Sequence, residues 1–274
     1  MTKFVFLTVS FVFTLTTLAQ TVPTIEWQHA LGGTNDDAAS AIQRTADGGY
    51  VVAGWSQSNN GDVTGNHGQG DCWVVKMNVD GAIQWQKTLG GSGFDSANSI
   101  RQTTDGGYIV VGLSPSTDGD VTGNHGGPDT WAVKLDSMGG IQWQKSLGGS
   151  LDDFGNDIRQ TTDGGYILAA APYSTDGDIT NSLGGPDFWV VKLDGSGSPQ
   201  WQTSLGGSGG DTPHSIQQCS DGGYIVAGET GSVDGDVTGS HGSFDYWVVK
   251  IDASGAIQWQ KALGGSGDDE ARSV

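Results

Sequence analysis

The chain has 274 residues, with 12 lysines and arginines against 31 aspartates and glutamates, and its formal net charge is -19. This charge repels the phosphate backbone of nucleic acids and anionic membrane surfaces, and no basic run offsets it locally, so we exclude nucleic acid as a partner. The two cysteines, Cys72 and Cys219, exclude a disulfide framework and lack the paired spacing of a zinc site. The 47 glycines predict many tight turns, and therefore short strands in place of long helices.

Residues 1–19 are predicted to be a secretory signal peptide. An apolar run follows Lys3, and small residues end the segment at Ala19. A membrane anchor is the alternative, but polar residues interrupt the run, which is short for a span of about 20 residues. We therefore expect cleavage near Gln20 and a secreted or cell-surface protein that does not insert into the membrane.

A unit of 58 residues repeats along the rest of the chain. One tryptophan recurs at this period, each time in a WQ..LGG segment: Trp27, Trp85, Trp143, Trp201 and Trp259. A DGGY motif and a second tryptophan keep the same step. A constant period is typical of repeat architectures, so each unit is expected to have the same fold.

Each unit is predicted to contain four antiparallel strands, which in one copy cover 99–103, 108–113, 130–136 and 141–147. The DGG segment at 105–107 predicts a tight hairpin turn between the first two strands. The middle strands are apolar on both faces, which indicates that neighbouring sheets cover them. We therefore predict an all-β fold, a β-propeller of four-stranded blades, with a β-solenoid as the alternative.

The propeller region is expected to cover residues 20–274. Residues 25–31 resemble a spare fourth strand, and residues 271–274 resemble a spare first strand. From these partial strands at both ends we expect a C-terminally incomplete propeller whose full form has at least five blades. The four complete blades are expected near 41–89, 99–147, 157–205 and 215–263.

The repeat resembles a known bacterial family. The segments LGGSGFDSANSI (89–100) and LGGSGDDEARS (263–273), with the DGGYIVVG and D.W.VKLD strands, resemble SBBP-type bacterial β-propeller repeats. They also look like repeat regions of large secreted proteins that carry a C-terminal type IX sorting domain, which would lie beyond Val274. The resemblance implies a propeller fold and a grouping with polysaccharide-degrading proteins, and it brings no catalytic residue to this chain.

The long connection between the second and third strands is the candidate metal site. In one unit it reads DGDVTGNHGGPD, in which Asp118, Asp120 and Asp129 fall at the first, third and twelfth positions of a calcium loop. Thr122 at the fifth position and aspartate at the twelfth depart from the usual ligands and predict modest affinity. The equivalent aspartates in the other units are Asp62, Asp71, Asp176, Asp178, Asp187, Asp234, Asp236 and Asp245.

A metal-free interpretation of these loops remains open. The Asp-Gly pairs can form turns, and the last aspartate can cap the next strand through backbone hydrogen bonds. His67, His125 and His241 recur in the loop, but Leu183 takes this place in the third unit, so we interpret these histidines as surface residues.

The sequence favours a non-enzymatic binding or adhesion scaffold over an enzyme. Catalysis usually needs one asymmetric group of residues, whereas the carboxylates here repeat from unit to unit. Adjacent pairs such as Asp152-Asp153 are expected to be solvated loop charges. Identical loops can form multivalent surfaces for an extracellular protein or glycan ligand. The alternative is a carbohydrate-binding or polysaccharide-processing protein, for which Trp55 and Tyr173 are the first candidates to stack on sugars.

Overall fold

The computed structural model describes residues 24–274, so the expected signal peptide lies outside the described residues. Residues 24–274 form sixteen strands and no α-helix, and hence no helix long and apolar enough to cross a membrane. The strands make four antiparallel sheets of four, each paired in chain order. This architecture is the predicted repeat of four-stranded propeller blades.

The strands alternate with hairpin turns and with the longer connections between the second and third strand of each sheet. The first strands begin slightly earlier than expected, for example at Ser96 in place of residue 99. In chain order the strands are β1 (Asp37–Arg44), β2 (Tyr50–Ser56), β3 (Asp71–Met77), β4 (Ile83–Leu89), β5 (Ser96–Gln102), β6 (Tyr108–Ser114), β7 (Asp129–Leu135), β8 (Ile141–Leu147), β9 (Asp153–Gln160), β10 (Tyr166–Pro172), β11 (Phe188–Leu193), β12 (Pro199–Leu205), β13 (Asp211–Gln218), β14 (Tyr224–Thr230), β15 (Asp245–Ile251) and β16 (Ile257–Leu263).

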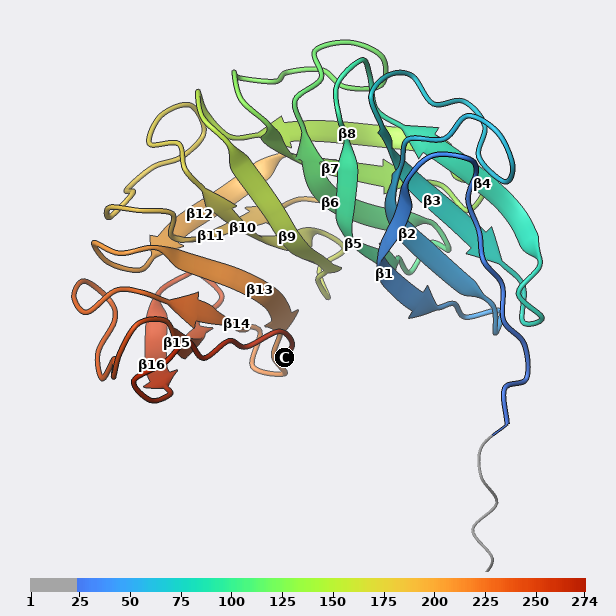
Figure 1. The fold of residues 1–274 in the computed structure, drawn as a ribbon. Helices are drawn as coiled ribbons and strands as arrows, with labels where there is room; N and C mark the ends of the chain where they lie inside the picture. The colour runs from blue at the N-terminus through green and yellow to red at the C-terminus, as the bar shows by residue number, and fades with distance from the viewer. Residues whose placement is uncertain (1–23) are drawn as a thin grey trace, which may run out of the picture.

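The four sheets follow one another around an arc (Figure 1). The first strands β1, β5, β9 and β13 lie on the inside of the arc, where β5 contacts β1 and β9, and β9 contacts β13. The fourth strands lie at the opposite edge of each sheet. The first strands therefore line a concave side that all four sheets share.

The hydrophobic core lies between the sheets. One cluster joins Val51 and Val74 of the first sheet to Ile100, Trp131 and Val133 of the second, and two further clusters join the second sheet to the third and the third to the fourth. The buried side chains in this cluster are at most 4% exposed. Burial contributes about 25 cal/mol for each Å² of apolar surface, so the stacked faces are the main stabilising contacts.

The hairpin between the first two strands is tied to the third strand by a buried lysine. Gly106 has a φ of 81°, as the predicted DGG turn requires. The Lys134 ammonium lies 2.9 Å from an Asp105 carboxylate oxygen and donates to the carbonyl of Leu135. The same lysine and aspartate pair recurs in every sheet.

The segment before β1 takes the position expected for a fourth strand, although it forms no hydrogen-bonded ladder. The Trp27 ring packs on Tyr50 with centroids 5.6 Å apart, as the Trp85 ring packs on Tyr108 at 5.6 Å. Residues 24–31 therefore contact the first sheet in the way that β4 contacts the second.

Each first strand contains a β-bulge at the same position. The residues skipped in the pairing with the second strand are Ser40, Asn98, Asn156 and His214. A bulge leaves its extra residue unpaired and redirects the side chain, and bulges are common beside functional sites. These four positions, named here the bulge residues, lie on the concave side of the arc.

Candidate functional site

The loops predicted to bind calcium contact the segment that precedes their own sheet. Asp118 accepts a hydrogen bond from the Ser92 amide at 2.7 Å, and Asp120 accepts one from the Gly90 amide at 3.3 Å. The same contacts recur at Asp176, Asp178, Asp234 and Asp236. Asp62 in the first sheet likewise accepts from the Gly32 amide. These aspartates thus anchor the loop to the connection between sheets.

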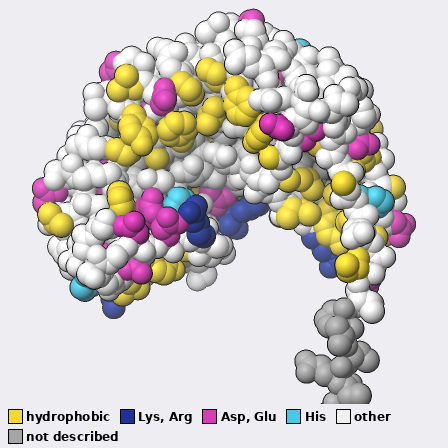
Figure 2. Space-filling model, in the orientation of Figure 1, with side chains coloured by type: hydrophobic (Ala, Val, Ile, Leu, Met, Phe, Trp, Pro, Cys, Tyr) yellow, Lys and Arg dark blue, Asp and Glu magenta, His cyan; other side chains and the backbone are white. Residues whose placement is uncertain are grey.

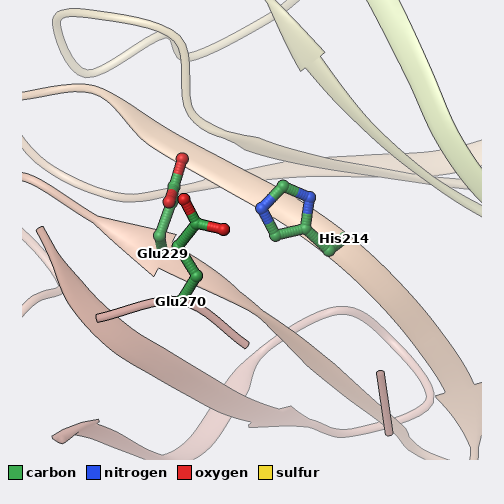
Figure 3. A group of neighbouring side chains, drawn as sticks. All are labelled: His214, Glu229 and Glu270. Atoms are coloured by element: carbon green, nitrogen blue, oxygen red, sulfur yellow. The ribbon is translucent and has the colours of Figure 1, made fainter. Parts of the chain in front are cut away.

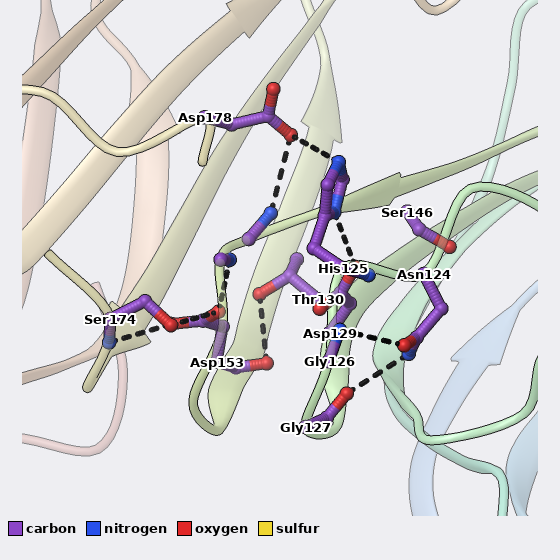
Figure 4. A network of polar contacts seen from close by, with 12 residues as sticks. Asn124, His125, Gly126, Gly127, Asp129, Thr130, Ser146, Asp153, Ser174 and Asp178 are labelled. Atoms are coloured by element: carbon purple, nitrogen blue, oxygen red, sulfur yellow. Dashed lines mark hydrogen bonds and ion pairs between the residues drawn. The ribbon is translucent and has the colours of Figure 1, made fainter. Parts of the chain in front are cut away.

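The twelfth residue of the loop faces the neighbouring sheet (Figure 4). Asp129 is fully buried at the start of β7, and its Oδ2 accepts a hydrogen bond from the His125 amide at 3.0 Å. A Cβ on Gly148 would lie 3.0 Å from Asp129 Oδ1 and would clash with Asp153 Oδ2. The carboxylates of Asp129 and Asp153 therefore converge on one glycine between the second and third sheets.

This pairing of aspartates recurs at the three junctions between described sheets, and once more between the fourth sheet and the C-terminal segment. In each pair the first member is the first residue of a third strand or immediately precedes it, and its Oδ1 is buried with no hydrogen-bond partner among the described residues. Burial raises the pKa of Asp71, Asp129 and Asp187, and a nearby carboxylate of the next sheet adds to each rise. The pairs are Asp71 with Asp95, Asp129 with Asp153, Asp187 with Asp211, and Asp245 with Asp269.

At the three junctions between sheets the second aspartate is held by several donors. Asp153 accepts hydrogen bonds from the Gly149 amide at 2.7 Å and from the amide and hydroxyl of Ser174. The sequence interpretation of Asp152-Asp153 as solvated loop charge is therefore wrong for Asp153, which is fully buried.

The recurring histidines contact these buried aspartates. His125 Nδ1 lies 2.7 Å from Asp129 Oδ2, and its Nε2 lies 3.9 Å from Asp178 Oδ2 of the next sheet. His67 and His241 approach Asp71 and Asp245 in the same way. The histidines are partly exposed, as the sequence suggested, but they also pair with a buried carboxylate, which the sequence analysis missed.

The third junction differs because Leu183 replaces the histidine there. The Leu183 amide donates to Asp187 Oδ2 at 2.8 Å. Burial raises the pKa of Asp187 to about 6, and Asp211 and Asp236 add to the effect. This junction concentrates negative charge without a histidine beside it.

The concave side holds a second candidate site, a polar cavity that spans all four first strands. It is lined by the four bulge residues together with Arg101, Asp157 and Arg272, and we name this lining the concave surface. Figure 2 shows the dark blue lysine and arginine side chains gathered in this hollow. The bulge positions carry serine, asparagine, asparagine and histidine, so the side chain at this position changes between units.

Asp157 lies at the centre of a hydrogen-bond network on this surface. It is 3% exposed, and it accepts from the Ser99 hydroxyl at 2.7 Å and from the Ile216 amide at 3.2 Å. The guanidinium groups of Arg101 and Arg159 lie 3.3 and 3.2 Å from its oxygens. Paired charges and amides of this kind can donate and accept hydrogen bonds to a polar ligand.

One end of the concave surface carries a group with the ligand types of a divalent metal (Figure 3). Ligand atoms of His214, Glu229 and Glu270 lie within 4.8 Å of one another. His214 Nε2 is buried and has no hydrogen-bond partner among the described residues. Arg272 pairs with Glu270 and supplies a positive charge to the group.

The non-repeating aromatic residues lie apart from the concave surface. Tyr173 is 53% exposed and lines a pocket with Leu151, Asp152 and Phe154. Its ring meets Phe154 edge to face, with centroids 5.9 Å apart. Trp55 packs on Phe94 with centroids 5.2 Å apart. An apolar ring beside a carboxylate is a surface on which a sugar can stack.

Comparisons with known proteins give only distant structural likenesses. No protein family and no curated protein matches the chain. A protein of unknown function from Bacteroides caccae is 12% identical, with a TM-score of 0.43, and 85% of each chain is covered. BamB from Moraxella catarrhalis is 14% identical, with a TM-score of 0.30, covering 85% of this chain and 79% of that one.

Proposed function

We propose that the protein is a non-enzymatic propeller scaffold that binds an extracellular protein or glycan on its concave surface. The observation that carries this proposal is the set of bulge residues. A repeated frame holds serine, asparagine, asparagine and histidine at the same bulge position, and all four side chains line one cavity. Curved repeat proteins commonly bind their partners on such a concave face.

The chemistry of the concave surface suits a polar ligand. Arg101 and Arg159 are both paired with Asp157, so two positive charges share one carboxylate and guanidinium donors remain at the edge of the network. Asn98 and Asn156 each donate across to the carbonyl of the next first strand, at 2.9 and 2.7 Å, so their side chains are fixed before a ligand arrives. Binding to fixed groups avoids part of the entropy cost of ordering them.

Export to the cell exterior belongs to the same proposal. The apolar leader at residues 1–19 and the resemblance to SBBP-type repeats of secreted proteins with a type IX sorting domain support it. We propose a secreted or cell-surface location for the scaffold.

Carbohydrate binding is the second candidate function. The exposed Tyr173 and the edge-to-face Phe154 form a pocket with the chemistry of a sugar-stacking site. This site lies outside the concave surface, so a substitution can separate the two functions.

A glycan and extracellular-protein array, with a hydrolysis assay on common polysaccharides, tests both candidates. The scaffold function predicts binding without turnover. Turnover of a polysaccharide would contradict it, and a loss of glycan binding in Tyr173→Ala, with the concave surface intact, would favour the second candidate.

A further inference from the structure

We propose that each junction between neighbouring sheets binds a calcium ion through its pair of buried aspartates, one from each sheet. This inference is independent of the proposed binding function, because it concerns the frame and can be tested without a ligand for the concave surface. The best-defined junction joins the third sheet to the fourth, through Asp187, which immediately precedes the third-sheet strand β11, and Asp211 at the start of β13.

Two carboxylate oxygens converge at this junction. A Cβ on Gly206 would clash with both Asp187 Oδ1 and Asp211 Oδ2. Glycine at this position therefore leaves room between oxygens that come from different sheets. Asp236 approaches the same glycine, since its Oδ2 accepts the Gly206 amide at 3.3 Å. Three carboxylates thus surround Gly206.

The oxygen of Asp187 that faces Asp211 lacks a compensating contact. Asp187 is 2% exposed, and its Oδ1 has no hydrogen-bond partner among the described residues, while Oδ2 accepts the Leu183 amide. Burying an unpaired charged oxygen is costly, and a second carboxylate beside it adds repulsion. A cation between the two oxygens would remove both costs.

Repetition strengthens the inference. The same unpartnered Oδ1 occurs at the equivalent position of all four units, at or immediately before the start of the third strand: Asp71, Asp129, Asp187 and Asp245. An accidental loss of a hydrogen bond would not recur at four equivalent places that differ in the residues around them. Hard oxygen donors with no nitrogen or sulfur between them favour calcium, and magnesium would demand a stricter octahedral geometry than two fixed aspartates provide.

The ligand set differs from that of a calcium loop. A site within one loop would use Asp176, Asp178 and Asp187, whereas the junction uses Asp187 with Asp211 from the next sheet. Asp176 is exposed, and its Oδ1 accepts the Ser150 amide at 2.8 Å. Asp176 and Asp211 therefore distinguish the two arrangements.

Calorimetric titration of the chelator-treated full chain with calcium tests the proposal. We expect binding heat, a calcium-dependent rise in Tm, and a stoichiometry that falls by one site in Asp187→Asn. The asparagine keeps the size of the side chain, and its Oδ1 can still accept the Leu183 amide. Asp176→Asn is the matched control, and it should keep the stoichiometry of the unmodified chain. Magnesium at the same concentration should produce a smaller rise in Tm.

Asp211→Asn provides the second variant, with its fold checked by circular dichroism. It should also lose one calcium site, although Asp211 lies outside every predicted loop. Loss of a site in Asp176→Asn but not in Asp211→Asn would place the ion inside the loop and overturn the junction site. Absence of both binding heat and a Tm change in the unmodified chain would overturn the proposal altogether and assign the paired aspartates a shared proton.

Discussion

Ile42 in β1 and Ile100 in β5 occupy the same position of the repeat, yet Ile42 is 62% exposed and Ile100 is fully buried. The two strands also share their pairing pattern and their bulge. The difference lies in the neighbouring sheets. β5 packs against strands of both the first and the third sheet, whereas β1 packs, outside its own sheet, against β5 of the second sheet. The apolar face of each sheet is therefore buried only where a neighbouring sheet packs on it, and the hydrophobic core forms between sheets.

The largest expected effect follows directly from this pair of isoleucines. We expect Ile100→Ala to lower the free energy of unfolding by about 2 to 5 kcal/mol, because it opens a cavity between two sheets. Ile42→Ala should change it by about 0.5 kcal/mol or less, as is usual at exposed positions. Urea unfolding followed by tryptophan fluorescence measures both. Equal losses would show that β1 is covered in solution.

The tryptophans of the fourth strands allow the same comparison at the outer edge. Trp143 packs on Tyr166 of the next sheet, with ring centroids 5.5 Å apart, and donates to the Gly195 carbonyl at 3.2 Å. Trp259 in β16 is 46% exposed. We expect Trp143→Ala to cost about 2 kcal/mol and Trp259→Ala clearly less, as measured by differential scanning calorimetry. A larger effect at Trp259 would contradict the sheet-stacking account.

The aspartates at the junctions and those in the hairpin turns should change the stability of the protein in opposite directions as the pH falls. Burial raises the pKa of Asp187 to about 6, so in calcium-free solution its contribution to stability increases as the pH falls from 7 toward about 4. Hydrogen bonds from the Thr161 hydroxyl and the Lys192 ammonium outweigh the effect of burial and lower the pKa of Asp163 to about 2. The contribution of Asp163 to stability is therefore lost as the pH falls from about 4 toward 2.

Melting temperatures of the chelated chain across this pH range check the prediction. Tm should pass through a maximum near about pH 4 to 5, and the rise from pH 7 should be smaller in Asp187→Asn. Asp176→Asn should keep the rise of the unmodified chain. A Tm that falls steadily from pH 7 downward would show that the buried aspartates carry no such penalty.

The sequence was sufficient to predict the strands and hairpins. The DGGY motif fixes the first turn, and the Trp131 and Trp143 positions mark strands that do pack between sheets. These features are local or follow from the constant period, so they can be identified from the order of residues alone.

The two candidate sites depend on contacts that the order of residues does not show. Asp129 and Asp153 belong to different sheets, and only the stacking brings their carboxylates to one glycine. The bulge at Asn98 interrupts an otherwise regular strand and turns the side chain toward the hollow. One signal was present in the sequence: the bulge position and both of its neighbours change from unit to unit.

The central claim is that the protein binds its ligand on the concave surface. Ligand binding by variants of this surface tests the claim most directly. The affinity of the ligands captured on the glycan and protein array is measured for three chains. The first is the unmodified chain, and the second, the concave variant, combines Arg101→Ala with His214→Ala. The third, the outer variant, combines Lys87→Ala with Lys145→Ala at exposed positions of the fourth strands β4 and β8. The account predicts at least about tenfold weaker binding for the concave variant, equivalent to about 1.4 kcal/mol, and unchanged binding for the outer one. Equal affinity of all three chains, or loss of affinity in the outer variant alone, would contradict it.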